Sequence, residues 1–214
     1  TAGLENISSK FSAMGVVGFT VLQNLTNGVI NFGKKIASST FGQMMSGGKT
    51  RALNLEQAQF QISGLGVDWE KQTESGVSLY YQIDKAVSGT AYDLDAAAKV
   101  AGQLLASNID AGTDKMQNAL SGISGVAAMT NSTYEEIGHI FTTIAGNGRV
   151  MTEQLNQFAG RGLNVAATLA EHLHVTEAEL RDMVSKGKVD FNTFAEAMNE
   201  AFGEQATKAN DTYT

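Results

Sequence analysis

Apolar residues recur at helical spacing along almost the whole chain, and the longest stripe lies near the N-terminus. Its positions follow one another three or four residues apart, with a mean spacing of about 3.6 residues, which is typical of an α-helix. The pattern predicts one long, or once broken, helix over residues 4–45, called the leader helix below. The stripe consists of Leu4, Ile7, Phe11, Met14, Gly18, Leu22, Leu25, Val29, Phe32 and Ile36.

The middle of this predicted helix is apolar on nearly every side, because Val16, Val17 and Phe19 lie off the stripe. Such a helix needs burial against several neighbours or against other copies of itself. The sequence therefore predicts self-association of the chain through the leader helix, with a trimer as the first expectation. The predicted contact residues are Phe11, Met14, Val17, Val21, Leu22 and Leu25.

Beyond the polar, glycine-containing break at Ser46-Gly-Gly-Lys-Thr50, the apolar spacing remains helical but in short pieces. No clean strand pattern appears. We predict an all-α fold, with a long N-terminal leader helix followed by a compact bundle of short helices. The expected divisions are residues 1–49 for the leader, 50–205 for the bundle and 206–214 for a polar tail that leads into the rest of a longer chain.

Residues suited to cap helices stand where the short helices are predicted to begin and end. Thr176-Glu-Ala-Glu179 is a capping box, in which Thr176 accepts from the helix and Glu179 reaches back to the start. Thr133 with Glu136 fits the same pattern, and Asp190 is suited to cap the helix that follows it. Gly187 stands where a left-handed residue typically ends a helix.

Composition narrows the function classes. The 214 residues contain no cysteine, which excludes a disulfide framework, a thiolate zinc site and a cysteine nucleophile. Proline is also absent, so helices must be stopped by glycine and by capping side chains. Aromatic content is only 7% and β-branched runs are scarce, which disfavours a β-sandwich or barrel. The net charge of −7 argues against sequence-independent binding to nucleic-acid phosphates. No secretory signal is visible, and the most apolar window, residues 13–22, is too short to span a membrane.

Two motifs resemble chemical sites. Ser46-Gly-Gly-Lys-Thr50 is similar to the end of a phosphate-binding loop but lacks the earlier glycine and the preceding strand. The pairs Glu136/His139 and Glu171/His174 repeat the Glu-x-x-His spacing of di-iron carboxylate bundles. A metal-binding helical enzyme is therefore one alternative function. We favour surface and capping roles for these residues, and predict no catalytic, cofactor-binding or metal-binding residue.

The C-terminal third carries a more specific pattern. The run Gly146-Asn-Gly-Arg-Val-Met-Thr-Glu-Gln-Leu-Asn-Gln-Phe-Ala-Gly-Arg-Gly162 leads into a short apolar helix that begins at Val165. After it come Val175-Thr-Glu-Ala-Glu-Leu-Arg-Asp-Met-Val-Ser-Lys-Gly-Lys-Val-Asp-Phe191 and Phe194-Ala-Glu-Ala-Met198. In this order the phrases closely resemble the tape measure domain of tail tape measure proteins from long-tailed bacteriophages and prophages. The resemblance covers about residues 50–205.

The resemblance implies a structural function and offers no catalytic residue to transfer. A tape measure protein sets the length of the phage tail, and tail tube subunits polymerise around it with the help of tail assembly chaperones. It occupies the tail lumen and leaves with or before the DNA. The implied partners are other copies of itself, tail tube and tail tip or baseplate proteins, and the host membrane during ejection. A second alternative, from residues 11–25, is a secreted, membrane-active helical effector.

Overall fold

The computed structural model describes residues 48–211, with side chains described for residues 51–210. The chain divides into two units, Thr1–Thr50 and Arg51–Thr214, and the described residues belong almost wholly to the second. The predicted leader helix, with its six expected contact residues, lies outside the described residues.

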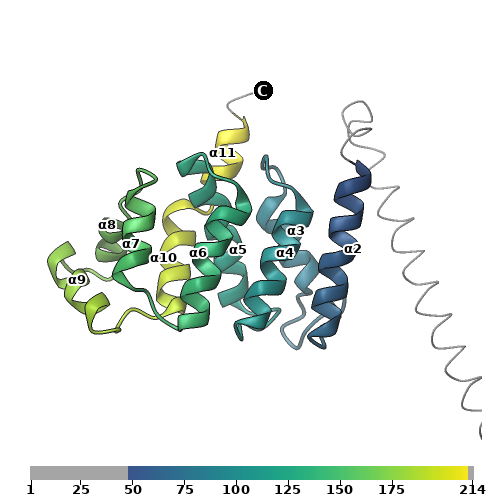
Figure 1. Cartoon of the computed structure of the whole chain (residues 1–214), viewed down its shortest axis with the longest axis horizontal. Coiled ribbons are helices and arrows are strands. Elements are labelled where there is room, and N and C mark those ends of the chain that lie inside the picture. Colours follow the sequence, from purple (N-terminus) through teal and green to yellow (C-terminus); the bar gives the residue numbers. More distant parts are fainter. Residues whose placement is uncertain (1–47, 212–214) are drawn as a thin grey trace, which may run out of the picture. The chain divides into compact units, whose positions relative to one another are not determined.

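Every regular element within residues 48–211 is an α-helix (Figure 1). Extended segments in this range pair only through two isolated bridges, Gln72 with Ser78 and Arg149 with Asp190. The all-α prediction is thus confirmed for the described part of the chain. The helices are α2 (Gly48–Gly64), α3 (Leu79–Val87), α4 (Leu94–Ala106), α5 (Asp114–Thr130), α6 (Tyr134–Asn147), α7 (Thr152–Ala159), α8 (Val165–His172), α9 (Glu177–Ser185), α10 (Phe191–Phe202) and α11 (Gln205–Asp211).

Helix α5 is the central element of the described unit and packs against α3, α6, α10 and α11 (Figure 1). Its apolar residues Met116, Leu120 and Ile123, spaced by four and three positions, are fully buried. The side of α5 that faces α10 carries Gly122 and Gly125. A Cβ atom on Gly125 would overlap the backbone carbonyl of Phe202, at the end of α10. Glycine therefore permits the close approach of these two helices.

An aromatic cluster joins α6, α7 and α10. The rings of Phe141, Phe158 and Phe194 are fully buried, and the centroid of Phe194 lies 4.7 Å from that of Phe141 and 5.9 Å from that of Phe158. Rings at these separations attract one another in addition to the hydrophobic contribution of their burial. The cluster fixes the C-terminal helices against the middle of the bundle.

Side-chain caps define where the short helices begin. Thr133 accepts from the backbone N–H of Glu136, and the Glu136 carboxylate accepts in turn from the N–H of Thr133, so α6 starts with a capping box. Asp190 Oδ1 accepts from Thr193 N at 2.8 Å and caps α10. Gly187, just after α9, has φ +67°, as predicted for a left-handed terminating residue.

The expected break at residues 46–50 is partly helical, because α2 begins at Gly48. Within the described residues, helical structure is therefore present from Gly48 onward, inside the segment that composition indicated as a boundary.

The residues after 205 form a helix where the sequence indicated only a polar tail. Helix α11 packs against α5, with Ala206 buried and Asn210 Nδ2 donating to Gly89 O at 3.2 Å. Its polar composition gave no sign of this contact, because the residues that attach it, among them Ala206 and Asn210, form no apolar stripe. No stripe of large apolar residues is needed for such a short helix.

Candidate functional site

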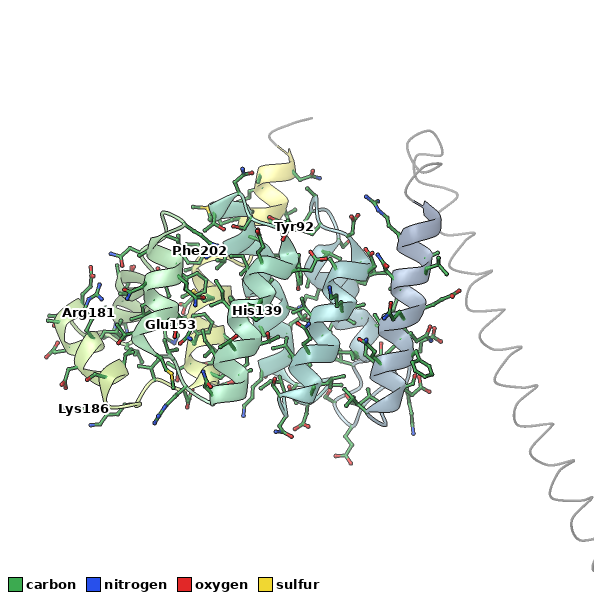
Figure 2. The ribbon with its side chains drawn as sticks, in the orientation of Figure 1. Tyr92, His139, Glu153, Arg181, Lys186 and Phe202 are labelled. Carbon is green, nitrogen blue, oxygen red and sulfur yellow. The ribbon has the colours of Figure 1, made fainter. Side chains whose placement is uncertain are left out.

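The residues of the alternative metal site are not brought together. Glu136 serves in the cap of α6, and His139 is exposed on the same helix, away from the α9 end marked by Arg181 and Lys186 (Figure 2). Within residues 51–210 no group of three or more His, Asp or Glu side chains is placed to bind a metal ion.

The second Glu-x-x-His pair, Glu171 and His174, is separated by the local backbone structure. Helix α8 ends at His172, and His174 lies beyond the C-cap with a left-handed φ of +55°. Glu171 and His174 therefore do not share one helical face, and that part of the motif interpretation was wrong. The histidine with a carboxylate partner is His172, whose Nδ1 lies 2.8 Å from Glu200 Oε2 and links α8 to α10.

Thr176 and Glu179 form a capping box at the start of α9. Thr176 Oγ1 accepts from Glu179 N at 3.2 Å, and Glu179 Oε2 accepts from both the N–H and the hydroxyl of Thr176 at 2.8 Å. The backbone hydrogen bond from Thr176, followed by the hydroxyl hydrogen bond, lowers the pKa of the Glu179 carboxyl. These residues fix the start of α9.

Replacing Thr176 with alanine should lower the free energy of unfolding by about 1 kcal/mol, the usual effect of losing a side-chain N-cap. Because the Glu179 carboxyl has a lowered pKa in the folded chain, its contribution is present above the unfolded pKa. It is lost as the pH falls through the folded pKa. In urea titrations the difference in stability between the two chains should therefore shrink at low pH without vanishing, because the hydrogen bond from Glu179 N to Thr176 Oγ1 does not titrate. Thr142→Ala, which removes a threonine from the side of α6, is the control, and an equal loss there would contradict the cap assignment.

A cavity of about 200 Å³ separates α2 from α4 and α6. Its lining is mostly polar. Asn54 Nδ2 donates to Asp95 Oδ2 at 3.1 Å across one side of it. Beside it, Arg51 and Asp93 form an ion pair at 3.1 Å. Partial burial raises the pKa of Asp93, and Arg51 opposes this shift while Asp95 and Glu135 add to it. The lining residues are Asn54, Gln57, Ala58, Gln61, Asp95, Ala96, Lys99 and Glu135.

The outward side of α2 carries large apolar side chains. Leu53 is 56% exposed and Phe60 is 79% exposed, whereas Ala58 and Ile62 on the opposite side are buried. An exposed phenylalanine of this degree is costly to leave in water, and such surfaces mark interaction sites. No described helix combines the length and hydropathy required to cross a lipid bilayer. This outer face, defined by Leu53 and Phe60, is the candidate functional surface of the described residues.

Comparison with known proteins decides the family. The family model described as Tape measure protein matches residues 70–214. The chain belongs to the tape measure protein family. Tape measure proteins are structural proteins of phage tails, so this chain has a structural role in a bacteriophage tail. No curated protein and no solved structure matches it.

The tape measure match is shifted relative to the sequence resemblance. It begins at residue 70 and continues to residue 214, whereas the quoted phrases indicated about residues 50–205. The matched part therefore contains α3 to α11, including the aromatic cluster and both capping boxes. Helix α2, with the exposed Leu53 and Phe60, precedes the match. The candidate surface therefore lies outside the matched residues.

Sequence reasoning missed the outer face of α2. The sequence predicted short helices beyond residue 50 but did not assign a buried or an exposed side to the one that contains Leu53 and Phe60. Ala58 and Ile62 are four residues apart and face inward, while Leu53 and Phe60 are seven apart and face outward. A helical wheel separates the two sets, so the signal was present in the spacing. This tape measure chain carries a helix with two apolar faces.

Proposed function

We propose that this chain is a segment of the protein that sets the length of a phage tail. In this role the tape measure protein lies in the lumen, tail tube subunits polymerise around it, and it leaves with or before the DNA. The observation that carries the proposal is the family match over residues 70–214, together with a described fold made of helices alone. A helix is a suitable ruler, because each residue adds a fixed rise of about 1.5 Å.

The proposed partners follow from this role. They are other copies of the chain, the tail tube, the tail tip or baseplate, and the tail assembly chaperones in the host cytoplasm. Contact with the host membrane belongs to the ejection step. The acidic net charge of −7 is compatible with a lumen through which DNA later passes, because like charges do not bind.

The predicted leader helix and the described helical unit should contribute differently to the length of the tail. The described helices are 7 to 17 residues long and pack back on one another, so residues 51–210 do not add 1.5 Å each along an axis. The predicted leader helix, in contrast, is the part of this chain that would measure length at the full helical rise. The effect of an insertion on tail length should therefore depend on which of these two parts receives it.

Insertion of about 28 helix-forming residues into the predicted leader helix should lengthen the tail by about 42 Å. Tail lengths would be measured by electron microscopy of virions that carry the altered gene. The matched control inserts the same residues after Gly162, in the exposed connection between α7 and α8, where tail length should not change. Unchanged length with the leader insertion would contradict the ruler function of this segment.

We also propose that copies of the chain associate through Phe11, Met14, Val17, Val21, Leu22 and Leu25, as a trimer. Leu22→Glu should dissociate the complex in sedimentation at tens of micromolar protein. Burial of one large apolar side chain contributes about 1.5–3 kcal/mol per chain, and a charge at this place removes that contribution. Gln23→Glu adds the same charge beside the stripe and should leave the sedimentation unchanged. Monomeric sedimentation of the unaltered chain would refute the association.

A further inference from the structure

Helix α2 is the least firmly attached helix of the described unit. Its backbone approaches its neighbours less closely than that of any other described helix, and Figure 1 shows it at the edge of the unit. Among residues 51–64, Ala58 and Ile62 are the only buried side chains. Ile62 lies against α4 at Gly102, where an added Cβ atom would be 3.5 Å from Ile62 Cγ1. Apolar burial therefore attaches α2 mainly through one short strip.

Polar contacts complete the attachment, and they are weak because water reaches them. Arg51 and Asp93 form an ion pair at 3.1 Å, but their side chains are 59% and 44% exposed. The hydrogen bond from Asn54 to Asp95 is exposed as well. Ion pairs of this exposure contribute little to stability. The polar cavity of about 200 Å³ between α2 and the helices α4 and α6 is large enough for several water molecules, so little dry surface becomes hydrated when α2 leaves.

A glycine hinge lies at the C-terminal end of α2. Gly66 has φ +82°, and a Cβ atom added to Gly64 or Gly66 would meet no neighbouring atom within 4 Å. Glycine also has the widest choice of backbone angles, so the chain can turn here without a steric clash. Beyond the hinge the chain is held firmly, because Trp69 is buried and its carbonyl oxygen accepts from Tyr80 N at 2.8 Å. The change from loose to firm attachment therefore falls between Gly64 and Trp69.

We propose that α2 is a detachable arm of this chain. It leaves α4 and α6 and turns about Gly64 and Gly66, while residues 67–211 stay folded. Proteins open in such local units where a segment has few buried apolar contacts, and α2 fits this description. A helix of 17 residues is only marginally stable in water by itself, so the released arm also unwinds part of the time.

A released α2 offers an apolar surface that the docked helix hides. In the docked form Leu53 and Phe60 are exposed, whereas Ala58 and Ile62 are covered by the domain. Release uncovers the second pair, so apolar residues on both sides of the helix are then accessible. The hinge lies shortly before residue 70, where the family match begins, and it forms a joint between the family domain and the chain that precedes it. Detachment of α2 does not depend on the proposed role in tail length.

Cysteine labelling of the full chain, which has no cysteine of its own, measures the detachment. Ile62→Cys places a thiol under α2, and Ile123→Cys places one at an equally buried position of α5. A maleimide reacts only while an opening exposes the thiol, so the labelling rate reports that opening. We expect Ile62→Cys to react at least about 100-fold faster than Ile123→Cys. Its rate should also depend less on urea, because the local opening exposes less surface than global unfolding.

Hydrogen exchange of the unaltered chain locates the hinge without any substitution. Amides of residues 52–63 should exchange at least about 100-fold faster than those of α5, while α3, anchored by the hydrogen bond from Tyr80 N to Trp69 O, should stay protected. The double variant Ile62→Cys and Gly102→Cys adds a lock, because the two positions lie close enough for a disulfide. Its oxidation should slow exchange of residues 52–63 at least about tenfold relative to the reduced form.

Three outcomes overturn the proposal. Equal labelling rates of Ile62→Cys and Ile123→Cys, with equal dependence on urea, would show that α2 leaves only when the whole unit unfolds. Exchange of α3 as fast as that of α2 would show that the opening unit extends past Gly66 and that the hinge is misplaced. Unchanged exchange of residues 52–63 in the locked double variant would show that α2 unwinds in place and does not detach.

Discussion

Replacing Gly125 with alanine should lower the free energy of unfolding by about 3 kcal/mol, and the melting temperature by about 10 °C. The added methyl group would overlap the carbonyl carbon and oxygen of Phe202. A flexible side chain could turn aside, but a backbone group at the end of α10 cannot, so α5 and α10 must separate. The higher helix propensity of alanine, about 1 kcal/mol, offsets only part of this cost.

Gly146→Ala is the matched control for this substitution. Gly146 also lies in a helix, α6, but it is exposed, and the nearest atom to an added Cβ is Ser107 Oγ at 4.0 Å. The free energy of unfolding of this variant should therefore rise by up to about 1 kcal/mol. Alanine has the higher helix propensity, and its methyl group overlaps no neighbouring atom here. Urea unfolding followed by circular dichroism measures both chains. Equal stabilities of the two variants would show that α5 and α10 do not approach as closely as described.

The contrast between these glycines shows where sequence reasoning reaches its limit. The sequence Gly146-Asn-Gly148 indicates a helix end, but nothing local shows that Gly125 must lack a side chain. Their roles differ because α10, more than sixty residues further along the chain, crosses over one and not the other. Contacts of this kind depend on tertiary packing, which periodicity does not encode.

Elements with strong local signals were predicted well. The capping boxes at Thr133 and Thr176 and the left-handed Gly187 depend on residues within one turn of the helix end, so a short window contains the whole cause. Helix α11 was missed for the opposite reason. Its attachment depends on Ala206 against α5 and on the carbonyl of Gly89, and neither partner is local.

The candidate surface was only half accessible from the sequence. The seven-residue spacing of Leu53 and Phe60 can be counted without a structure. Which side of α2 faces its own domain cannot, because Ala58 and Ile62 are no more apolar than the pair they oppose. The structure resolves this choice by burying Ala58 and Ile62, and it thereby identifies the other face as free.

Replacing Phe194 with alanine should lower the free energy of unfolding by about 4 kcal/mol, within the usual range for a buried phenylalanine. The ring of Phe194 is fully buried and contacts both Phe141 and Phe158, so its removal leaves a void between α6, α7 and α10. Those neighbours are themselves held by helix packing and cannot collapse fully into the space. The expected fall in melting temperature is about 10 °C or more.

Tyr81→Ala provides the comparison, because Tyr81 is an aromatic residue on α3 that is 54% exposed. Its loss should change stability by less than about 1 kcal/mol, since little buried surface is removed. Trp69, the single tryptophan of the chain, is buried near α3 and gives a second probe far in sequence from Phe194. If residues 51–210 unfold as one cooperative unit, tryptophan fluorescence and circular dichroism should report the same lowered midpoint for Phe194→Ala. A midpoint by fluorescence that stays at the value of the unaltered chain would show instead that the aromatic cluster stabilises only the C-terminal helices.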